Sequence, residues 1–346
     1  MTKQTAVVIC PGRGTYNKEE LGYLSRYHSD KKAMLDVIDR YRQAQGQPSV
    51  TGLDAMSAYK LPVHTAGENA SALIYACARG DFAAIDRDKY DIVAVTGNSM
   101  GWYIALAMAE ALDEQGAIEL INTMGSMMSG GVIGGQMIYP ISDDNWHEDS
   151  AQKVQIMQWM EEANQLPGCE VYPSIWLGGY LVLGGNEAGL KAMEQRLPRL
   201  QDRYPMRLYN HAAFHTPLLA SVSQKAFEQL PARLFKRPQL PLIDGEGRIW
   251  QPHSTDTAAL HRYTLDTQVV APYDYSKAIE VAIKEFAPDK LIILGPGATL
   301  GGATAQVLIK HQWHNLQNKQ DFIQQQQQEP LLLAMGLEGQ RQLATK

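Results

Sequence analysis

A serine between two glycines is the residue of this 346-residue chain best placed for nucleophilic chemistry. It is Ser99, in Gly97-Asn-Ser-Met-Gly101, with the apolar run 91–96 before it and the run 102–111 after it. The first run predicts a buried strand and the second a helix, so the serine is expected at a strand–turn–helix corner. Such a corner exposes the hydroxyl near a helix N-terminus, which favours a nucleophilic role. The alternative is a glycine-rich turn whose serine has no catalytic part.

A nucleophilic serine needs a base, and the chain has nine histidines. His215 stands out because it lies in Ala212-Ala-Phe-His-Thr-Pro-Leu-Leu219, a segment that follows the middle part of the chain. A lone histidine is more often a surface or core side chain than a catalytic one. On residue type alone, His215 is therefore only a candidate for the base.

Composition and charge exclude several classes of protein. The chain is 45% hydrophobic and 20% charged, which suits a globular protein. Its net charge of −6 gives no overall basic footprint for nucleic acid, and no apolar run approaches the length of a membrane span. The first apolar stretch is too short for a signal-peptide core, so a cytoplasmic enzyme is expected. Cys10, Cys77 and Cys169 fit neither a disulfide framework nor a zinc site, and we expect no metal.

Strands and helices alternate in the first and last parts of the chain. The runs 6–10, 91–96 and 290–294 have the composition of buried strands, with helical stretches between them. This alternation indicates a parallel sheet with helices on its faces. We therefore predict an α/β fold whose large catalytic domain spans residues 1–132 and 208–315.

The middle of the chain has a different order of elements. Residues 133–207 predict the order β-α-β-β-α-β, which is the pattern of a ferredoxin-like unit. We take it as a small subdomain inserted into the large domain. Residues 316–346 are predicted to form a Gln-rich C-terminal tail, because the run Gln324–Gln328 is typical of a mobile, non-catalytic segment.

Five segments, in order, resemble the malonyl-CoA:acyl-carrier-protein transacylase family, also found as the acyltransferase domains of fatty-acid and polyketide synthases. The resemblance covers roughly residues 6–312 and rests on Pro11-Gly-Arg-Gly14, the G-x-S-x-G segment, Phe214-His-Thr-Pro-Leu218, Gln268 ahead of Pro272, and Gly295-Pro-Gly-Ala-Thr-Leu300. It implies a large α/β-hydrolase-like domain with a parallel sheet and an inserted ferredoxin-like subdomain.

The resemblance also implies a mechanism, a ping-pong acyl transfer in fatty-acid or polyketide biosynthesis. Ser99 would attack the thioester of an acyl-CoA, and His215 would act as the base, oriented by the main-chain carbonyl of Gln268. The backbone N–H groups of Arg13 and Met100 would form the oxyanion hole. The acceptor would be the phosphopantetheine thiol of an acyl carrier protein. Acyl-CoA is then a substrate, and no cofactor is implied.

Four residues expected at the acyl pocket depart from the family pattern. Met124 stands in place of the carboxylate-binding arginine, and Asn98, Trp102 and Trp176 also differ from the family's residues. Methionine offers a carboxylate no hydrogen bond, and a buried carboxylate without a partner is costly. We therefore expect a pocket that favours an uncharged acyl group. The alternative is that Arg13, which replaces the usual glutamine of the first loop, supplies the missing cation.

Other functions use the same features differently. An acyl-thioester hydrolase that edits acyl carrier proteins would share the fold, Ser99 and His215, and would resolve the acyl-enzyme with water. A non-catalytic scaffold would not need these two residues together with Gln268. An unrelated α/β-hydrolase usually orders its triad Ser, Asp or Glu, His, and lacks the insertion. Four arginines form either a docking face for the carrier protein or a solvated edge: Arg196, Arg199, Arg203 and Arg207.

Overall fold

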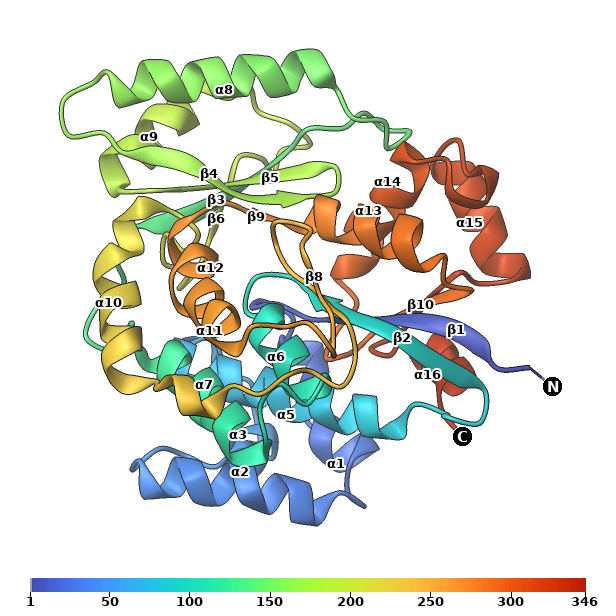
Figure 1. The fold of residues 1–346 in the computed structure, drawn as a ribbon. Coiled ribbons are helices and arrows are strands. Elements are labelled where there is room, and N and C mark those ends of the chain that lie inside the picture. The colour runs from blue at the N-terminus through green and yellow to red at the C-terminus, as the bar shows by residue number, and fades with distance from the viewer. Residues whose placement is uncertain (1) are drawn as a thin grey trace.

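The computed structural model describes residues 2–346 as a mixed α/β protein with two sheets (Figure 1). The larger sheet has six strands in the order β11-β10-β1-β2-β7-β8. Neighbouring strands in it are parallel, except that β7 and β8 form an antiparallel pair. Its strands are β1 (Gln4–Cys10), β2 (Tyr90–Gly97), β7 (Leu242–Ile243), β8 (Ile249–Trp250), β10 (Lys290–Ile293) and β11 (Leu332–Ala334).

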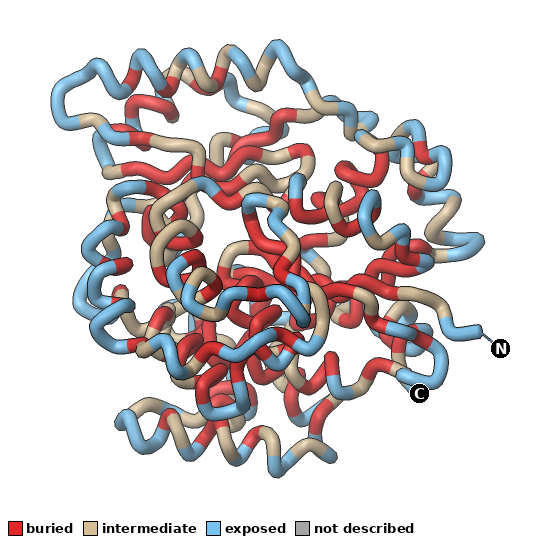
Figure 2. Tube along the Cα trace, in the orientation of Figure 1, coloured by how far each residue is buried: buried red, intermediate tan, exposed pale blue. Residues whose placement is uncertain are grey.

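Helices cover both faces of the large sheet, and in Figure 1 α5, α6 and α7 lie below it while α13 and α14 lie above it. Residues 6–10 of β1 are fully buried as a result, which explains their unbroken apolar composition. Figure 2 shows the buried chain gathered in these strands and the helix faces against them. The helices of this part are α1 (Tyr23–Tyr27), α2 (Lys32–Ala44), α3 (Val50–Asp54), α4 (Leu61–His64), α5 (Gly67–Ala84), α6 (Gly101–Met108), α7 (Glu114–Ser126), α10 (Ala220–Gln229), α11 (Thr257–Leu265), α12 (Thr267–Val270), α13 (Tyr275–Phe286) and α14 (Leu300–Lys310).

The second sheet has five strands in the order β6-β3-β5-β4-β9 and lies at the top of Figure 1 beneath α8. Along the chain its elements are β3 (Gly135–Pro140), α8 (Ser150–Asn164), β4 (Val171–Leu177), β5 (Tyr180–Gly185), α9 (Glu187–Arg196), β6 (Met206–Leu208) and β9 (Tyr273–Asp274). Within residues 133–207 this is the order β-α-β-β-α-β. β9, from outside that range, adds a parallel strand beside β4. The hydrolase-like and ferredoxin-like descriptions of the two parts stay predictions.

The C-terminal segment 316–346 differs from the mobile tail that its glutamines predict. It folds into α15 (Lys319–Gln328), the strand β11 and α16 (Glu338–Ala344). β11 pairs in parallel with β10, from Leu291 with Leu332 to Ile293 with Ala334. The apolar run 331–335 is buried at this edge of the large sheet, and burial of that run decides the fold of the segment. The prediction of a mobile tail was wrong because it rested on the glutamine run 324–328, whereas the apolar run 331–335 decides the fold.

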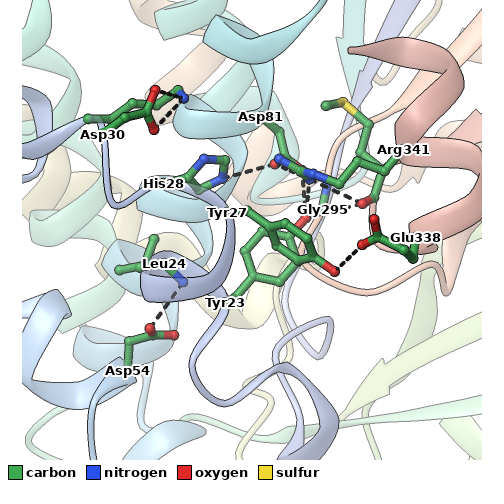
Figure 3. A network of polar contacts seen from close by, with 12 residues as sticks. Tyr23, Leu24, Tyr27, His28, Asp30, Asp54, Asp81, Gly295, Glu338 and Arg341 are labelled. Carbon is green, nitrogen blue, oxygen red and sulfur yellow. Dashed lines mark hydrogen bonds and ion pairs between the residues drawn. The ribbon is translucent and has the colours of Figure 1, made fainter. Parts of the chain in front are cut away.

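A buried polar network ties α16 to the N-terminal part of the chain (Figure 3). Asp81 on α5 has no exposed surface, and its carboxylate accepts hydrogen bonds from Arg341 Nη1 at 2.6 Å and Tyr23 Oη at 2.7 Å. The amide of Gly295 donates to the same carboxylate at 2.7 Å, and His28 Nε2 lies 2.9 Å from it. Arg341 is therefore the cation that balances a carboxylate removed from water.

Replacing Arg341 with methionine is expected to lower the free energy of unfolding by about 3–5 kcal/mol, the usual cost of breaking a buried ion pair. Urea denaturation measures this change. The matched control is Lys346→Gln, which removes an exposed pair of 2.7 Å with Asp88 and is expected to change stability little. Equal decreases in the free energy of unfolding of the two variants would show that the buried network does not stabilise the fold more than an exposed ion pair does.

The remaining short elements are the 3₁₀ helices η1 (Lys18–Glu20), η2 (Pro217–Leu219), η3 (Ala232–Leu234) and η4 (Trp313–Asn315). Among residues 2–346, no helix is both long and apolar enough to cross a membrane.

Candidate active site

The turn that carries Ser99 joins the end of β2 to the start of α6. Ser99 has a φ of 55°, in the left-handed region that residues with a Cβ rarely adopt. A Cβ on Gly97 would collide with the backbone of Gly101, and a Cβ on Gly101 would collide with the Cys10 carbonyl at the end of β1. Both glycines are therefore required for the turn to close against β1. The strained turn presents the serine hydroxyl to a cavity beside the N-terminus of α6.

His215 reaches this hydroxyl from the loop between β6 and η2. Its Nε2 lies 2.6 Å from Ser99 Oγ, and its Nδ1 lies 2.5 Å from the main-chain oxygen of Gln268. A carbonyl only accepts, so Nδ1 carries the proton and Nε2 is free to accept the serine proton. Burial lowers the pKa of His215 to about 4, against a smaller opposite effect of the Gln268 carbonyl. The imidazole is therefore neutral at pH 7 and able to act as a base.

The side chain of Gln268 also supports the nucleophile, which its main-chain role did not predict. Its Nε2 donates to the main-chain oxygen of Ser99 at 3.0 Å, and its Oε1 accepts from Tyr103 Oη at 2.7 Å. Tyr273 Oη donates to the Gly97 carbonyl at 2.6 Å on the other side of the turn. Gln268 therefore contacts His215 through its main-chain carbonyl and the Ser99 carbonyl through its side chain. Tyr103 and Tyr273 add hydrogen bonds to Gln268 and to the Gly97 carbonyl. Nothing in their spacing along the sequence indicated these contacts.

Two backbone amides are available for an oxyanion beside Ser99. Arg13 and Met100 both line the cavity, and no acceptor for either amide N–H is found among residues 2–346. Met100 is the residue before the first turn of α6, so the helix dipole also stabilises a negative charge near its amide. A tetrahedral oxyanion needs such donors, so the oxyanion hole of Arg13 and Met100 stays a prediction that these free amides allow.

The cavity has a volume of about 430 Å³ and lies where the two sheets meet. Ser99 and His215 stand at one wall. The other walls are largely apolar and come from both parts of the molecule, including Ile121, Met128, Ile138, Ile175, Leu177 and Phe214. A chamber of this kind suits an acyl chain attached to the serine.

Of the four expected pocket residues, the structure brings two to the cavity. Met124 on α7 and Asn98 before the nucleophile both line it and are nearly fully buried. The side chain of Asn98 leaves its buried Oδ1 without a hydrogen-bond partner within the described chain. These two positions can therefore contact a bound acyl group.

The expectation for the two tryptophans was wrong. Trp102 is fully buried against α11, where its Nε1 donates to Thr264 Oγ1 at 3.0 Å, and it does not line the cavity. Trp176 lies under Lys153 of α8, 4.4 Å from ring centroid to Nζ, while its neighbours Ile175 and Leu177 line the cavity. Alternate residues of a strand face opposite sides of the sheet, so the tryptophan of β4 cannot share the cavity with its neighbours.

The four arginines near the end of the small sheet do not form one free basic face. Arg207 pairs with Glu194 at 2.6 Å and with Glu187 at 3.2 Å, which neutralises much of its charge. Arg203 is exposed and also lines the cavity. Arg203 is therefore the member of the group placed closest to an incoming substrate.

No family model and no curated protein matches the sequence. The malonyl-CoA:acyl carrier protein transacylase of Xanthomonas oryzae pv. oryzae matches the structure with a TM-score of 0.77 at 16% identity, over 100% of this chain and 98% of that one. The Synechocystis enzyme of the same name matches with a TM-score of 0.74 at 18% identity, over 98% and 99%.

A third solved structure holds a malonyl-transacylase in complex with its type II polyketide-synthase acyl carrier protein. It matches with a TM-score of 0.73 at 18% identity, over 99% of each chain. The chain therefore has the fold of the malonyl-CoA:acyl-carrier-protein transacylases, the family that its five motifs resemble.

Proposed function

We infer that the protein is an acyl-CoA:acyl-carrier-protein S-acyltransferase that works through a covalent acyl-Ser99 intermediate. The observation that carries this proposal is the hydrogen-bonded chain from Ser99 Oγ to His215 to the Gln268 carbonyl, placed on a strand–turn–helix corner beside free amides. The fold and its neighbours support the same class of reaction.

In the first half-reaction, Ser99 Oγ attacks the thioester carbonyl carbon while His215 Nε2 takes the hydroxyl proton. The carbonyl electrons move to the oxygen, which the amides of Arg13 and Met100 stabilise. When the tetrahedral intermediate collapses, the carbon–sulfur bond breaks and the CoA sulfur takes the proton from His215. The acyl group is left as an ester on the serine.

The second half-reaction reverses these steps with a new thiol. The phosphopantetheine thiol of an acyl carrier protein gives its proton to His215 and attacks the ester carbonyl, and Ser99 leaves with the proton returned. The structural neighbour solved with its acyl carrier protein supports a carrier protein as acceptor. Hydrolysis of the acyl-enzyme by water is the alternative outcome of this step.

The test is intact mass spectrometry after incubation with single acyl-CoAs, followed by addition of a holo acyl carrier protein. We expect a mass increase equal to one acyl group, located by peptide mapping at Ser99. On addition of the carrier protein, the mass should move to its pantetheine thiol faster than free acid appears. Release of free acid at the same rate with and without carrier protein would favour the hydrolase instead.

Gln268→Ala is expected to lower the single-turnover acylation rate roughly ten-fold, because the Tyr103 hydroxyl and the Ser99 carbonyl lose a buried partner. KM should stay near its parental value, and so should the pH profile, because the main-chain carbonyl that orients His215 remains. Gln158→Ala, an exposed residue of α8, is the matched control. A variant that acylates at the parental rate would show that the amide contributes only packing.

A further inference from the structure

We propose that the acyl group which Ser99 accepts is an uncharged aliphatic chain longer than acetyl. This inference rests on the proposed function and names the substrate class for the same cavity. Three features of the cavity support it: an apolar stripe along α7, an apolar face of the second sheet, and polar side chains that are neutral or already bonded. The volume of about 430 Å³ leaves room for such a chain beside the serine.

The first feature is the stripe along α7. Ile121 and Met124 on α7, and Met128 just beyond its end, follow one another at the spacing of a helical turn. All three line the cavity and are nearly fully buried. Methionine is flexible and polarisable, so it adapts its shape to an apolar partner and fills the gaps around it. The stripe therefore offers an acyl group apolar contact and no charge.

The second sheet presents three β-branched side chains to the same cavity, Ile138 of β3, Ile175 of β4 and Val182 of β5. Val182 is paired with Ile138 on one side and with Ile175 on the other, so the three are cross-strand neighbours on one face. Their χ1 angles are stiff, which makes this wall rigid. A carboxylate against it would lose its hydration without gaining a hydrogen bond.

Two polar side chains of the lining, Gln136 and His211, are bonded to each other and carry no charge. Gln136 Nε2 donates to Ser174 Oγ at 2.8 Å, and Gln136 Oε1 lies 3.1 Å from His211 Nδ1. Burial, and to a smaller extent the Arg13 charge, lowers the pKa of His211 to about 3. The imidazole is therefore neutral at pH 7, and its Nδ1 donates to the amide oxygen of Gln136.

Arg13 and Arg203 also line the cavity, and each is held by another part of the protein. Arg13 Nη2 donates to the Thr65 carbonyl at 2.6 Å and Arg13 Nε is buried, so the side-on edge of these two nitrogens is closed to a carboxylate. The charge of Glu68 already offsets part of the Arg13 field. Arg203 is exposed, with its Nε 3.4 Å from Met206 Sδ, and an exposed cation gains little from pairing. An alkyl group therefore gains more than a carboxylate from entering the cavity.

The first test separates charge from size. Isovaleryl-CoA and malonyl-CoA carry acyl groups of nearly the same shape, because an isopropyl group in one stands where the other has a carboxylate. Second-order rate constants of Ser99 acylation are measured by intact mass spectrometry on one protein sample, so the folded fraction cancels from their ratio. Isovaleryl-CoA is expected to react at least about 30-fold faster, because a buried carboxylate without an equivalent partner is costly.

The second test measures the effect of chain length. Each buried methylene is worth about three- to four-fold in a rate constant, so hexanoyl-CoA is expected to exceed acetyl-CoA by at least about 30-fold. Met124→Phe fills part of the cavity and should lower this ratio about ten-fold, and Val182→Phe should do the same from β5. Met157→Phe, on α8 and outside the cavity lining, is the matched control and should keep the parental ratio.

A parent protein that prefers malonyl-CoA to isovaleryl-CoA, or acetyl-CoA to hexanoyl-CoA, overturns the inference. An unchanged ratio of hexanoyl-CoA to acetyl-CoA in both phenylalanine variants of the cavity overturns it as well. In each of these cases Ser99 is still acylated, so the proposed function stands. If no acyl-CoA labels Ser99, the proposed function fails and this inference fails with it.

Discussion

Ser99→Ala is expected to abolish the acyl adduct that the parent protein forms with acyl-CoA. No other group replaces the hydroxyl that His215 Nε2 meets at 2.6 Å, so the covalent route is lost. Loss of a nucleophilic serine typically lowers turnover by more than about 1000-fold. The measurement is intact mass spectrometry with peptide mapping over residues 91–111.

Ser71→Ala is the matched control, because Ser71 lines the same cavity from α5, whereas the hydroxyl hydrogen-bonded to His215 Nε2 is that of Ser99. It should keep the adduct. An adduct of the same mass in Ser99→Ala would place the nucleophile elsewhere and overturn the mechanism.

His215→Ala is expected to reduce the acylation rate by about 100- to 10 000-fold, the range for a positioned general base. The parental rate should stay level from about pH 8 to about pH 6 and fall as the pH approaches the His215 pKa of about 4, where the imidazole becomes protonated. The variant should lose this pH dependence along with the rate. Single-turnover acylation over this pH range measures both effects.

The lowered pKa of His215 also makes folding stability depend on pH, and the direction of this dependence limits the pH range of the rate measurements. The His215 pKa lies near 6.5 when the residue is exposed and at about 4 in the fold, so between these values only the unfolded chain binds this proton. This histidine therefore lowers stability as the pH falls through that window. Circular dichroism at each pH checks that the rates come from folded protein. His253→Ala, an exposed histidine, is the control, and a loss of similar size there would contradict the role of His215.

The local parts of the site could be predicted from the sequence because short-range sterics and periodicity decide them. The turn at Ser99 needs glycine at 97 and 101 because a Cβ at either position would collide with backbone atoms, and the apolar runs beside it define a strand and a helix. The roles of His215 and Gln268 were predicted from the order of the family motifs along the chain, and not from a local structural pattern. The structure brings both to Ser99, as the resemblance implied.

Packing between segments far apart in the chain decided the features of the site and fold that the sequence did not predict. Alternation along β4 shows that Trp176 and its neighbours face opposite sides, but only the position of the sheet shows which side is the cavity. The contact of Tyr103 with Gln268 joins residues 165 positions apart, and the strand β11 exists only because β10 offers it a partner edge.

The sequence by itself determined an α/β fold, a corner serine and a candidate histidine, because these depend on residue types within short windows. Only the tertiary structure showed that Arg13, from the loop after β1, lines the cavity that holds Ser99. The sequence placed Met124 where a cation was expected, and left Arg13 as an alternative. The reach of Arg13 to the Thr65 carbonyl, with its Nε buried and unpartnered, depends on how the loop after β1 packs against α5 and α7. A side chain that spans elements far apart in the chain is positioned by packing, which no local pattern encodes.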